Sequence, residues 1–114
     1  MPFINTKVSF RMTEAQKERI KNKLGVAIEL IPGKSENWLM VGFQDNYSLY
    51  FKGQVFERIA YVEVKIFGSA SRSAYEKLTK AICDIFEEEL KIPSDKVYVT
   101  YDEVSNWGWN GSNF

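Results

Sequence analysis

Hydrophobic and polar positions divide the chain into segments with two different spacings. Residues 3–10 are rich in apolar side chains and predict a strand. A helix is expected next, because apolar residues recur there every three or four positions with charged residues between them. Its apolar positions are Ile20, Leu24, Ala27, Ile28 and Ile31. Residues 13–16, Thr-Glu-Ala-Gln, have the pattern of a capping box at its start, and Pro32-Gly33 ends it.

The same order of segments then appears a second time. Residues 38–43 predict a strand, and a short aromatic strand is expected at 48–51. A longer strand at 59–67 follows, then a break at Gly68, a second helix and a strand at 97–101. The apolar positions of the second helix are Tyr75, Leu78, Ile82, Phe86 and Leu90. The two units also share their helix-to-strand joints, because each joint contains an Ile-Pro pair.

Two tandem βαβ units with right-handed crossovers predict an α+β (α/β) fold, in which a four-stranded mixed sheet carries both helices on one face. Residues 1–114 form a single domain of ordinary size. Because strands rich in Val, Ile, Tyr and Trp would leave a large apolar patch on the uncovered face, we expect an oligomer. The segments near Tyr50 and at 107–109 are candidate edge strands that extend a neighbour's sheet.

Composition narrows the range of partners. Fifteen basic residues balance fifteen acidic ones, so no nucleic-acid or anionic membrane partner is expected. Charged residues break the apolar runs, which stay below the roughly 18 to 20 residues that span a bilayer. The amino-terminal segment lacks the apolar core of a signal peptide, and Cys83 has no second cysteine to pair with, so we expect a cytoplasmic location. On its helix, Cys83 is expected to be a small packed hydrophobe.

The sequence contains no histidine, and this excludes several kinds of catalytic site. Ser-His-Asp triads, Cys-His pairs and histidine zinc sites are impossible, and one cysteine cannot form a thiolate cage. Glycine-rich phosphate loops are also absent. No metal or cofactor is therefore expected, and acid–base chemistry must come from a carboxylate, a lysine, a tyrosine, the cysteine or the amino terminus.

The amino terminus offers a candidate base. An initiator methionine is usually removed before a small residue, so Met1-Pro2 predicts a mature chain with a free prolyl amine at the start of a strand. An α-amine has a pKa of about 7.7 to 8.0 in peptides, which burial or a nearby cation would lower toward neutrality. Lys34 follows the Pro-Gly helix stop, and we expect it beside the start of the first strand.

These features resemble the macrophage migration inhibitory factor and D-dopachrome tautomerase family of the tautomerase superfamily. The similarity extends over essentially the whole chain and includes Met1-Pro2, Gly33-Lys34, residues 96–99 (Lys-Val-Tyr-Val) and residues 108–114 (Gly-Trp-Asn-Gly-Ser-Asn-Phe). The resemblance implies the doubled βαβ fold, a homotrimer with sites at subunit interfaces, and cofactor-independent tautomerisation of a small aromatic 2-oxo acid such as phenylpyruvate.

The resemblance also assigns roles to individual residues. Pro2 would be the catalytic base, and Lys34 would pair with the substrate carboxylate. Val64 would supply a backbone N–H donor, and Tyr98 would enter the site from a neighbouring subunit. The expected aromatic wall of the pocket consists of Phe3, Trp107, Trp109 and Phe114.

Several positions depart from the family pattern. Thr100 stands where many members carry an asparagine that hydrogen-bonds near the site. Trp38 replaces a family tyrosine at the pocket mouth, and Trp107 is bulkier than its usual counterpart, which predicts a narrower or differently covered pocket. The Cys-x-x-Cys segment of some members is Phe-Glu-Arg-Ile here, at residues 56–59, so thiol redox chemistry is not expected.

Two further functions compete with the tautomerase hypothesis. One is a cytokine-like or other interaction protein with weak or vestigial activity, released by a leaderless route and recognised by a protein receptor. The other is a different superfamily chemistry, such as hydrolytic dehalogenation or decarboxylation, which relies on active-site arginines. The arginines of this chain do not fall at positions that can be tied to the pocket.

Overall fold

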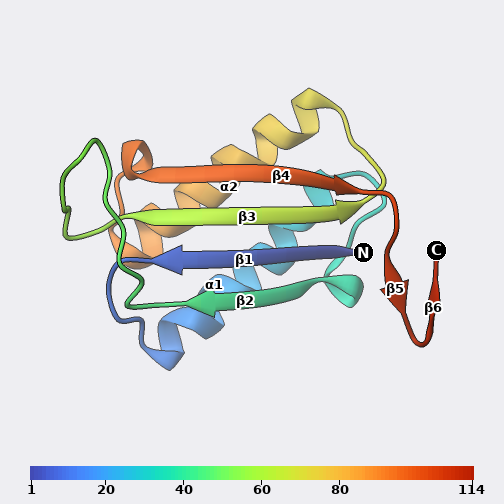
Figure 1. Ribbon diagram of the computed structural model, residues 1–114, viewed down its shortest axis with the longest axis horizontal. Coiled ribbons are helices and arrows are strands. Elements are labelled where there is room, and N and C mark those ends of the chain that lie inside the picture. The colour runs from blue at the N-terminus through green and yellow to red at the C-terminus, as the bar shows by residue number, and fades with distance from the viewer.

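The computed structural model describes residues 1–114 and contains two α-helices and a four-stranded sheet (Figure 1). The main elements, in chain order, are β1 (Pro2–Val8), α1 (Glu14–Ala27), β2 (Met40–Gln44), β3 (Ala60–Phe67), α2 (Arg72–Leu90) and β4 (Val97–Val104). Short 3-10 helices occur at Ile28–Leu30, Glu36–Trp38 and Ser94–Lys96, and β5 (Gly108–Trp109) pairs with β6 (Ser112–Asn113) in a terminal hairpin. Neither helix has the length and apolarity needed to cross a bilayer.

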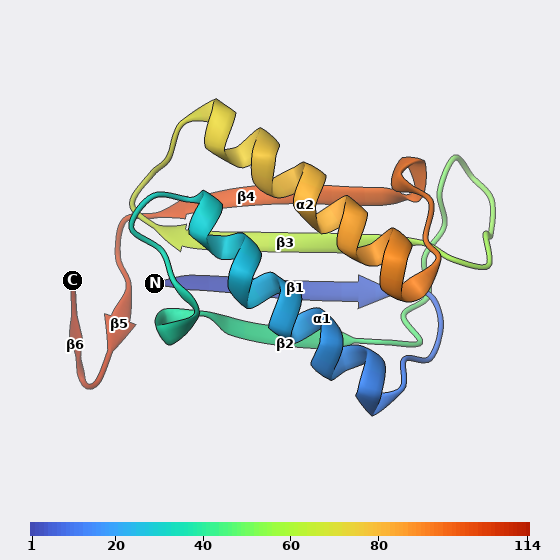
Figure 2. The same cartoon turned by 180° about the vertical axis from the view of Figure 1, so that it is seen from behind.

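The sheet has the order β2-β1-β3-β4, with two parallel pairs joined by one antiparallel pair. Each parallel pair belongs to one βαβ unit, and β1 and β3 run antiparallel at the centre, where the two units meet. Both helices cover the same face of the sheet (Figure 2). The predicted doubled βαβ fold is therefore confirmed.

Local sequence signals account for the main elements. Thr13 accepts a hydrogen bond from the backbone N–H of Gln16, whose side chain accepts one from the Thr13 N–H, so the predicted capping box is formed. Burial alternates strictly along β1 and β3, which directs every second side chain against the helices. The core has Phe86 of α2 among its largest fully buried side chains and draws on both helices and the two central strands.

The face of the sheet away from the helices, called the open face below, corrects one expectation. Instead of an apolar patch it carries mainly polar side chains along its middle, namely Asn5, Lys7, Gln44, Glu63, Lys65, Thr100 and Asp102. They bond one another, for example Lys7 to Glu63 at 3.0 Å and Asn5 to Gln44 at 2.9 Å. Alternation explains the difference, because the Val and Ile side chains of the two central strands point toward the helices. The larger apolar side chains of the open face, Phe3, Met40, Tyr61 and Tyr98, lie toward its two ends.

The expected strand at 48–51 is also wrong. In this region only Phe51 forms an isolated bridge, to Gln54, and residues 47–50 have no regular structure. Asn46 and Lys52 on either side have positive φ angles of 52° and 53°, which interrupt extended backbone. The second strand starts two residues later than expected, at Met40, because Glu36–Trp38 forms a 3-10 helix.

Candidate active site

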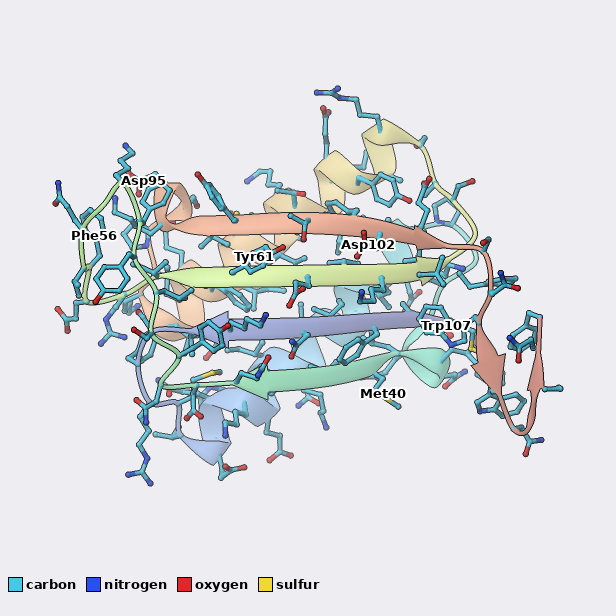
Figure 3. The ribbon with its side chains drawn as sticks, in the orientation of Figure 1. Met40, Phe56, Tyr61, Asp95, Asp102 and Trp107 are labelled. Atoms are coloured by element: carbon cyan, nitrogen blue, oxygen red, sulfur yellow. The ribbon has the colours of Figure 1, made fainter.

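A cleft of about 820 Å³ lies at the end of the sheet where β1 begins. It is bounded by the start of β1, the Glu36–Trp38 turn with the start of β2, the ends of β3 and β4, and the start of the terminal hairpin. Its lining consists of Met1, Pro2, Phe3, Asn37, Trp38, Leu39, Met40, Lys65, Val104, Asn106, Trp107, Gly108 and Trp109. Figure 3 shows Met40 and Trp107 at this end of the sheet.

The amino terminus is held in place at the cleft. Pro2 is buried and is the first residue of β1, where it pairs with Ile66 of β3. The Met1 carbonyl continues the ladder by accepting a hydrogen bond from the Phe67 N–H at 2.9 Å. Burial and the adjacent Lys34 ammonium hold the pKa of the Met1 amine below its ordinary value. An amine at this terminus therefore occupies a fixed and partly desolvated place.

Lys34 lies beside the amino terminus as well. Gly33 has a φ of 81°, which favours glycine, and it turns the chain after the helix. The Lys34 ammonium then donates a hydrogen bond to the Phe67 carbonyl at 2.8 Å. Lys34 does not line the cleft directly, but its charge acts on the terminal amine beside it.

Aromatic side chains form most of the cleft wall. Phe3, Trp38, Trp107 and Trp109 all line it, and Trp38 meets Trp109 edge to face with 5.1 Å between ring centroids. Phe114 lies outside the lining and instead packs on Phe67, at 5.6 Å between centroids. The Phe114 N–H also donates to the Trp107 carbonyl at 3.0 Å, so Phe114 closes the hairpin that carries the two tryptophans.

The structure does not bring Val64 to the cleft. Its side chain is buried in the core, and its backbone lies inside the sheet between Ile4 and Tyr101. An amide in an interior strand is directed at a neighbouring strand, so the Val64 N–H is not available to a ligand. The backbone N–H at the cleft end of β3 belongs to Phe67 and is bonded only to the Met1 carbonyl. Gly68 is the sequence feature that could have located this donor, because it ends β3 directly after Phe67.

Lys65 is another residue at the cleft that sequence reasoning missed, together with Asn37, Leu39, Met40, Val104 and Asn106. The strict alternation of β3 contained the signal, because Val62, Val64 and Ile66 face the helices and Lys65 must face the open side. Lys65 pairs with Phe3 in the sheet register, which places both on the floor of the cleft.

Hydrogen bonds to Glu103 hold the end of β4, just before the chain enters the cleft wall. One Glu103 carboxylate oxygen accepts from the Tyr75 hydroxyl at 2.6 Å and from the Ala70 N–H at 3.3 Å. Burial and this carboxylate raise the pKa of Tyr75 to about 12. The tyrosine therefore stays a donor at neutral pH and ties α2 to the strand that leads into the hairpin.

Tyr98 and Thr100 lie at the opposite end of the sheet. They line a smaller pocket of about 280 Å³ with Leu49, Tyr50, Phe51, Ile59, Ala60, Tyr61 and Lys96. Thr100 bonds the Tyr61 hydroxyl at 2.9 Å, and Tyr98 meets Phe51 edge to face at 5.3 Å. Figure 3 shows Phe56 and Asp95 at this end, far from Trp107. Within one chain, Tyr98 and Thr100 do not meet Pro2.

The acidic residues do not form a metal site. No group of three or more His, Cys, Asp or Glu side chains is arranged to hold a metal ion. Cys83 is partly buried on α2, away from the cleft lining, and burial raises the pKa of its thiol. The chemistry available at the cleft is therefore that of an amine, two lysines, backbone donors and aromatic rings.

Comparison with known proteins identifies the relatives of this chain. Leishmania major MIF2 is 31% identical, with a TM-score of 0.93 over 100% of this chain and 97% of that one. A macrophage migration inhibitory factor homologue of Prochlorococcus marinus is 30% identical, with a TM-score of 0.82 over 98% of each chain. Macrophage migration inhibitory factor of Xenopus laevis is 47% identical over 38 residues, which span 32% of this chain and 33% of that protein.

A family model described as "Macrophage migration inhibitory factor (MIF)" matches residues 1–114. This match covers every element of the fold and both ends of the sheet. The chain belongs to the macrophage migration inhibitory factor family.

Proposed function

We propose that this protein is a cofactor-independent keto–enol tautomerase that acts on arylpyruvates such as phenylpyruvate. Family membership supports a tautomerase-like role. The observation that carries the finer proposal is the fixed amino terminus, whose amine is partly desolvated, lies beside Lys34 and borders an aromatic cleft. Removal of Met1 would place the prolyl amine one residue further along the same strand.

In the proposed reaction, the neutral Pro2 nitrogen takes a proton from the carbon next to the substrate carbonyl. Negative charge then develops on the carbonyl oxygen, and the prolinium ion returns the proton there to give the enol. The reverse sequence converts enol to ketone. A positioned base of matched pKa contributes about 10²- to 10⁴-fold to such a proton transfer.

Two neighbouring groups would assist this transfer. Loss of Met1 removes the acceptor of the Phe67 N–H, which becomes a backbone donor for a substrate oxygen beside the new amine. The Lys34 ammonium, which donates to the Phe67 carbonyl in the structure, would pair with the substrate carboxylate. The aromatic side chains of Phe3, Trp107 and Trp109 would hold the substrate ring.

We further propose that the active form is a homotrimer. Tyr98 is 61% exposed at the far end of the sheet, and Thr100 lies beside it on the open face. Both outer strands, β2 and β4, also present unpaired edges. In a ring of three chains, the far end of one sheet would complete the cleft of the next.

The test is steady-state isomerisation of phenylpyruvate and 4-hydroxyphenylpyruvate by protein whose intact mass shows that Met1 has been removed. The expected result is turnover that falls by about 10²-fold or more in the Pro2→Gly variant. Absence of turnover in the processed protein, or turnover that the substitution leaves unchanged, would contradict the proposal.

A further inference from the structure

The cleft floor carries one charged side chain for which the proposed tautomerase has no use. Among the 13 lining residues, Lys65 is the only one with an ionisable side chain. It stands between Phe3 of β1 and Asp102 of β4 in the sheet register, so it lies in the middle of the floor. Figure 3 looks onto this face and shows Asp102 on β4 and Met40 on β2, at the edges of the same region.

Lys65 is more accessible to a ligand anion than Lys7, the other lysine of the open face. Lys7 is 20% exposed, lies 3.0 Å from Glu63 and has two tyrosine rings within 6 Å, at 5.2 and 5.7 Å. Lys65 is 43% exposed, and its one ionic partner, Asp102 at 3.3 Å, is 67% exposed. An ion pair this exposed adds little stability, so a ligand anion can replace or join it at little cost.

Lys65 and the carbonyl that holds Lys34 lie on the same strand, β3. Lys34 is anchored on the carbonyl of Phe67, and Lys65 lies two residues earlier in β3. Two residues of extended strand separate these points by about 7 Å. A substrate that places one carboxylate near Lys34 would therefore extend its other end over the floor toward Lys65.

We propose that Lys65 binds a second anionic group, so that among the 2-oxo acids that enter the cleft, those with a second carboxylate beyond the carbonyl bind more tightly. The inference rests on the proposed function, since it refines the substrate class of the same cleft. An ammonium recognises a carboxylate as a compact charge and needs no fixed geometry. Asp102 then acts as a competitor that holds Lys65 when no substrate is bound.

The experiment compares 2-oxoglutarate with its 5-methyl ester, which has nearly the same shape and lacks the second charge. Binding to the processed protein is measured by titration calorimetry. We expect the dianion to bind about tenfold more tightly than the ester. Lys65→Met should abolish this preference and Lys65→Arg should keep it, whereas Asp102→Asn should enlarge it. Lys7→Met is the matched control on the same face and should leave the preference unchanged.

The outcomes separate this inference from the proposed function, because phenylpyruvate turnover is measured on the same preparations. Equal binding of the two ligands, absence of binding by both, or a preference that survives in Lys65→Met overturns the role of Lys65, whatever the turnover. A preference that depends on Lys65 supports the anion site even where phenylpyruvate is not turned over, and in that case only the tautomerase proposal fails.

Discussion

The two ends of the sheet are related by the internal repeat, yet they differ in chemistry. β1 and β3 begin at opposite ends, and each helix-to-strand joint brings a lysine to the start of one of them. Lys34 donates to the Phe67 carbonyl at the cleft end, whereas Lys96 lies over the Phe56 ring at 4.7 Å and near Asp95 at 3.2 Å. The repeated topology therefore places a cation at both ends.

In the proposed processed protein, the two ends differ in the covalent state of the first strand residue, because loss of Met1 frees the Pro2 nitrogen. β1 begins at the chain terminus, while β3 begins in the middle of the chain, after Ile59. An amide nitrogen cannot act as a base, so the far end has no counterpart to a terminal amine. The tryptophan hairpin is likewise present at one end only (Figure 1). The two βαβ units thus share their backbone topology, but the side chains and chain ends that they carry differ.

The largest expected effect comes from making the cleft end resemble the far end. Protein that retains Met1 keeps the Pro2 nitrogen in an amide bond and the Phe67 N–H bonded to the Met1 carbonyl. We expect it to turn over phenylpyruvate about 10²- to 10⁴-fold more slowly than processed protein. The two forms, distinguished by intact mass, are compared in a steady-state assay. Equal rates would show that the prolyl amine is not the base.

A second experiment tests whether the two ends meet between chains. Tyr98→Ala alone should lower turnover by about 10²-fold, because the substrate is no longer held in place. When Tyr98→Ala and Pro2→Gly chains are refolded together, each mixed trimer contains one intact site, and random mixing should restore about a quarter of the wild-type rate. Sedimentation velocity gives the size of the assembly. If verified mixed trimers show no recovery of turnover, Tyr98 of one chain and Pro2 of another do not share a site.

Replacing the lysine at each end in turn tests whether only the lysine at the cleft end affects catalysis. Burial and Lys34 lower the pKa of the Met1 amine, and we expect the same two causes to act on the prolyl amine of the processed protein. Lys34→Met should therefore raise the pKa of the prolyl amine and move the acidic limb of the pH–rate profile to higher pH. At neutral pH, kcat/KM should fall roughly tenfold, since the carboxylate partner is also lost. Lys96→Met is the control at the far end. An equal shift in both variants would mean that the net charge of the protein, and not the position of the lysine, sets the pH–rate profile.

The smallest expected effect is on stability and comes from a substitution in the middle of β1, between the two ends of the sheet. Thr6 is fully buried in β1, and its hydroxyl has no hydrogen-bond partner. Thr6→Val should raise the free energy of unfolding by about 1 kcal/mol, because it removes an unpaired buried polar group without changing the volume much. Chemical denaturation measures this change. Thr100→Val, where the hydroxyl bonds Tyr61, is the matched control and should bring no gain.

Much of the fold could be predicted from the sequence because its signals are local. The capping box of Thr13 and Gln16 and the spacing of the buried helix positions depend on neighbours within one turn. The open face is polar although the strands are apolar on average, because that average combines the two faces of each strand. Glu63 and Lys65 alternate with Val62 and Val64, so the polar side was visible in the pattern.

The site was harder to predict because it depends on strand register and on where strands stop. Val64 and Phe67 lie on one strand, and only the pairing of Phe67 with Met1 shows which amide reaches the cleft. The alternation of β3 predicts that Lys65 faces the open side, but its position at the cleft depends on its pairing with Phe3 in the neighbouring strand. The separation of Tyr98 from Pro2 follows from the antiparallel centre of the sheet and has no local sequence signal.

The position of the tryptophans makes the protein its own optical probe. All three tryptophans of the chain, Trp38, Trp107 and Trp109, line the cleft. Intrinsic fluorescence excited at the indole band therefore originates at one end of the sheet. A ligand that enters the cleft should quench or shift this emission without any attached dye. Loosening of the hairpin should also change fluorescence before circular dichroism, which follows the helices behind the sheet, records any loss of structure.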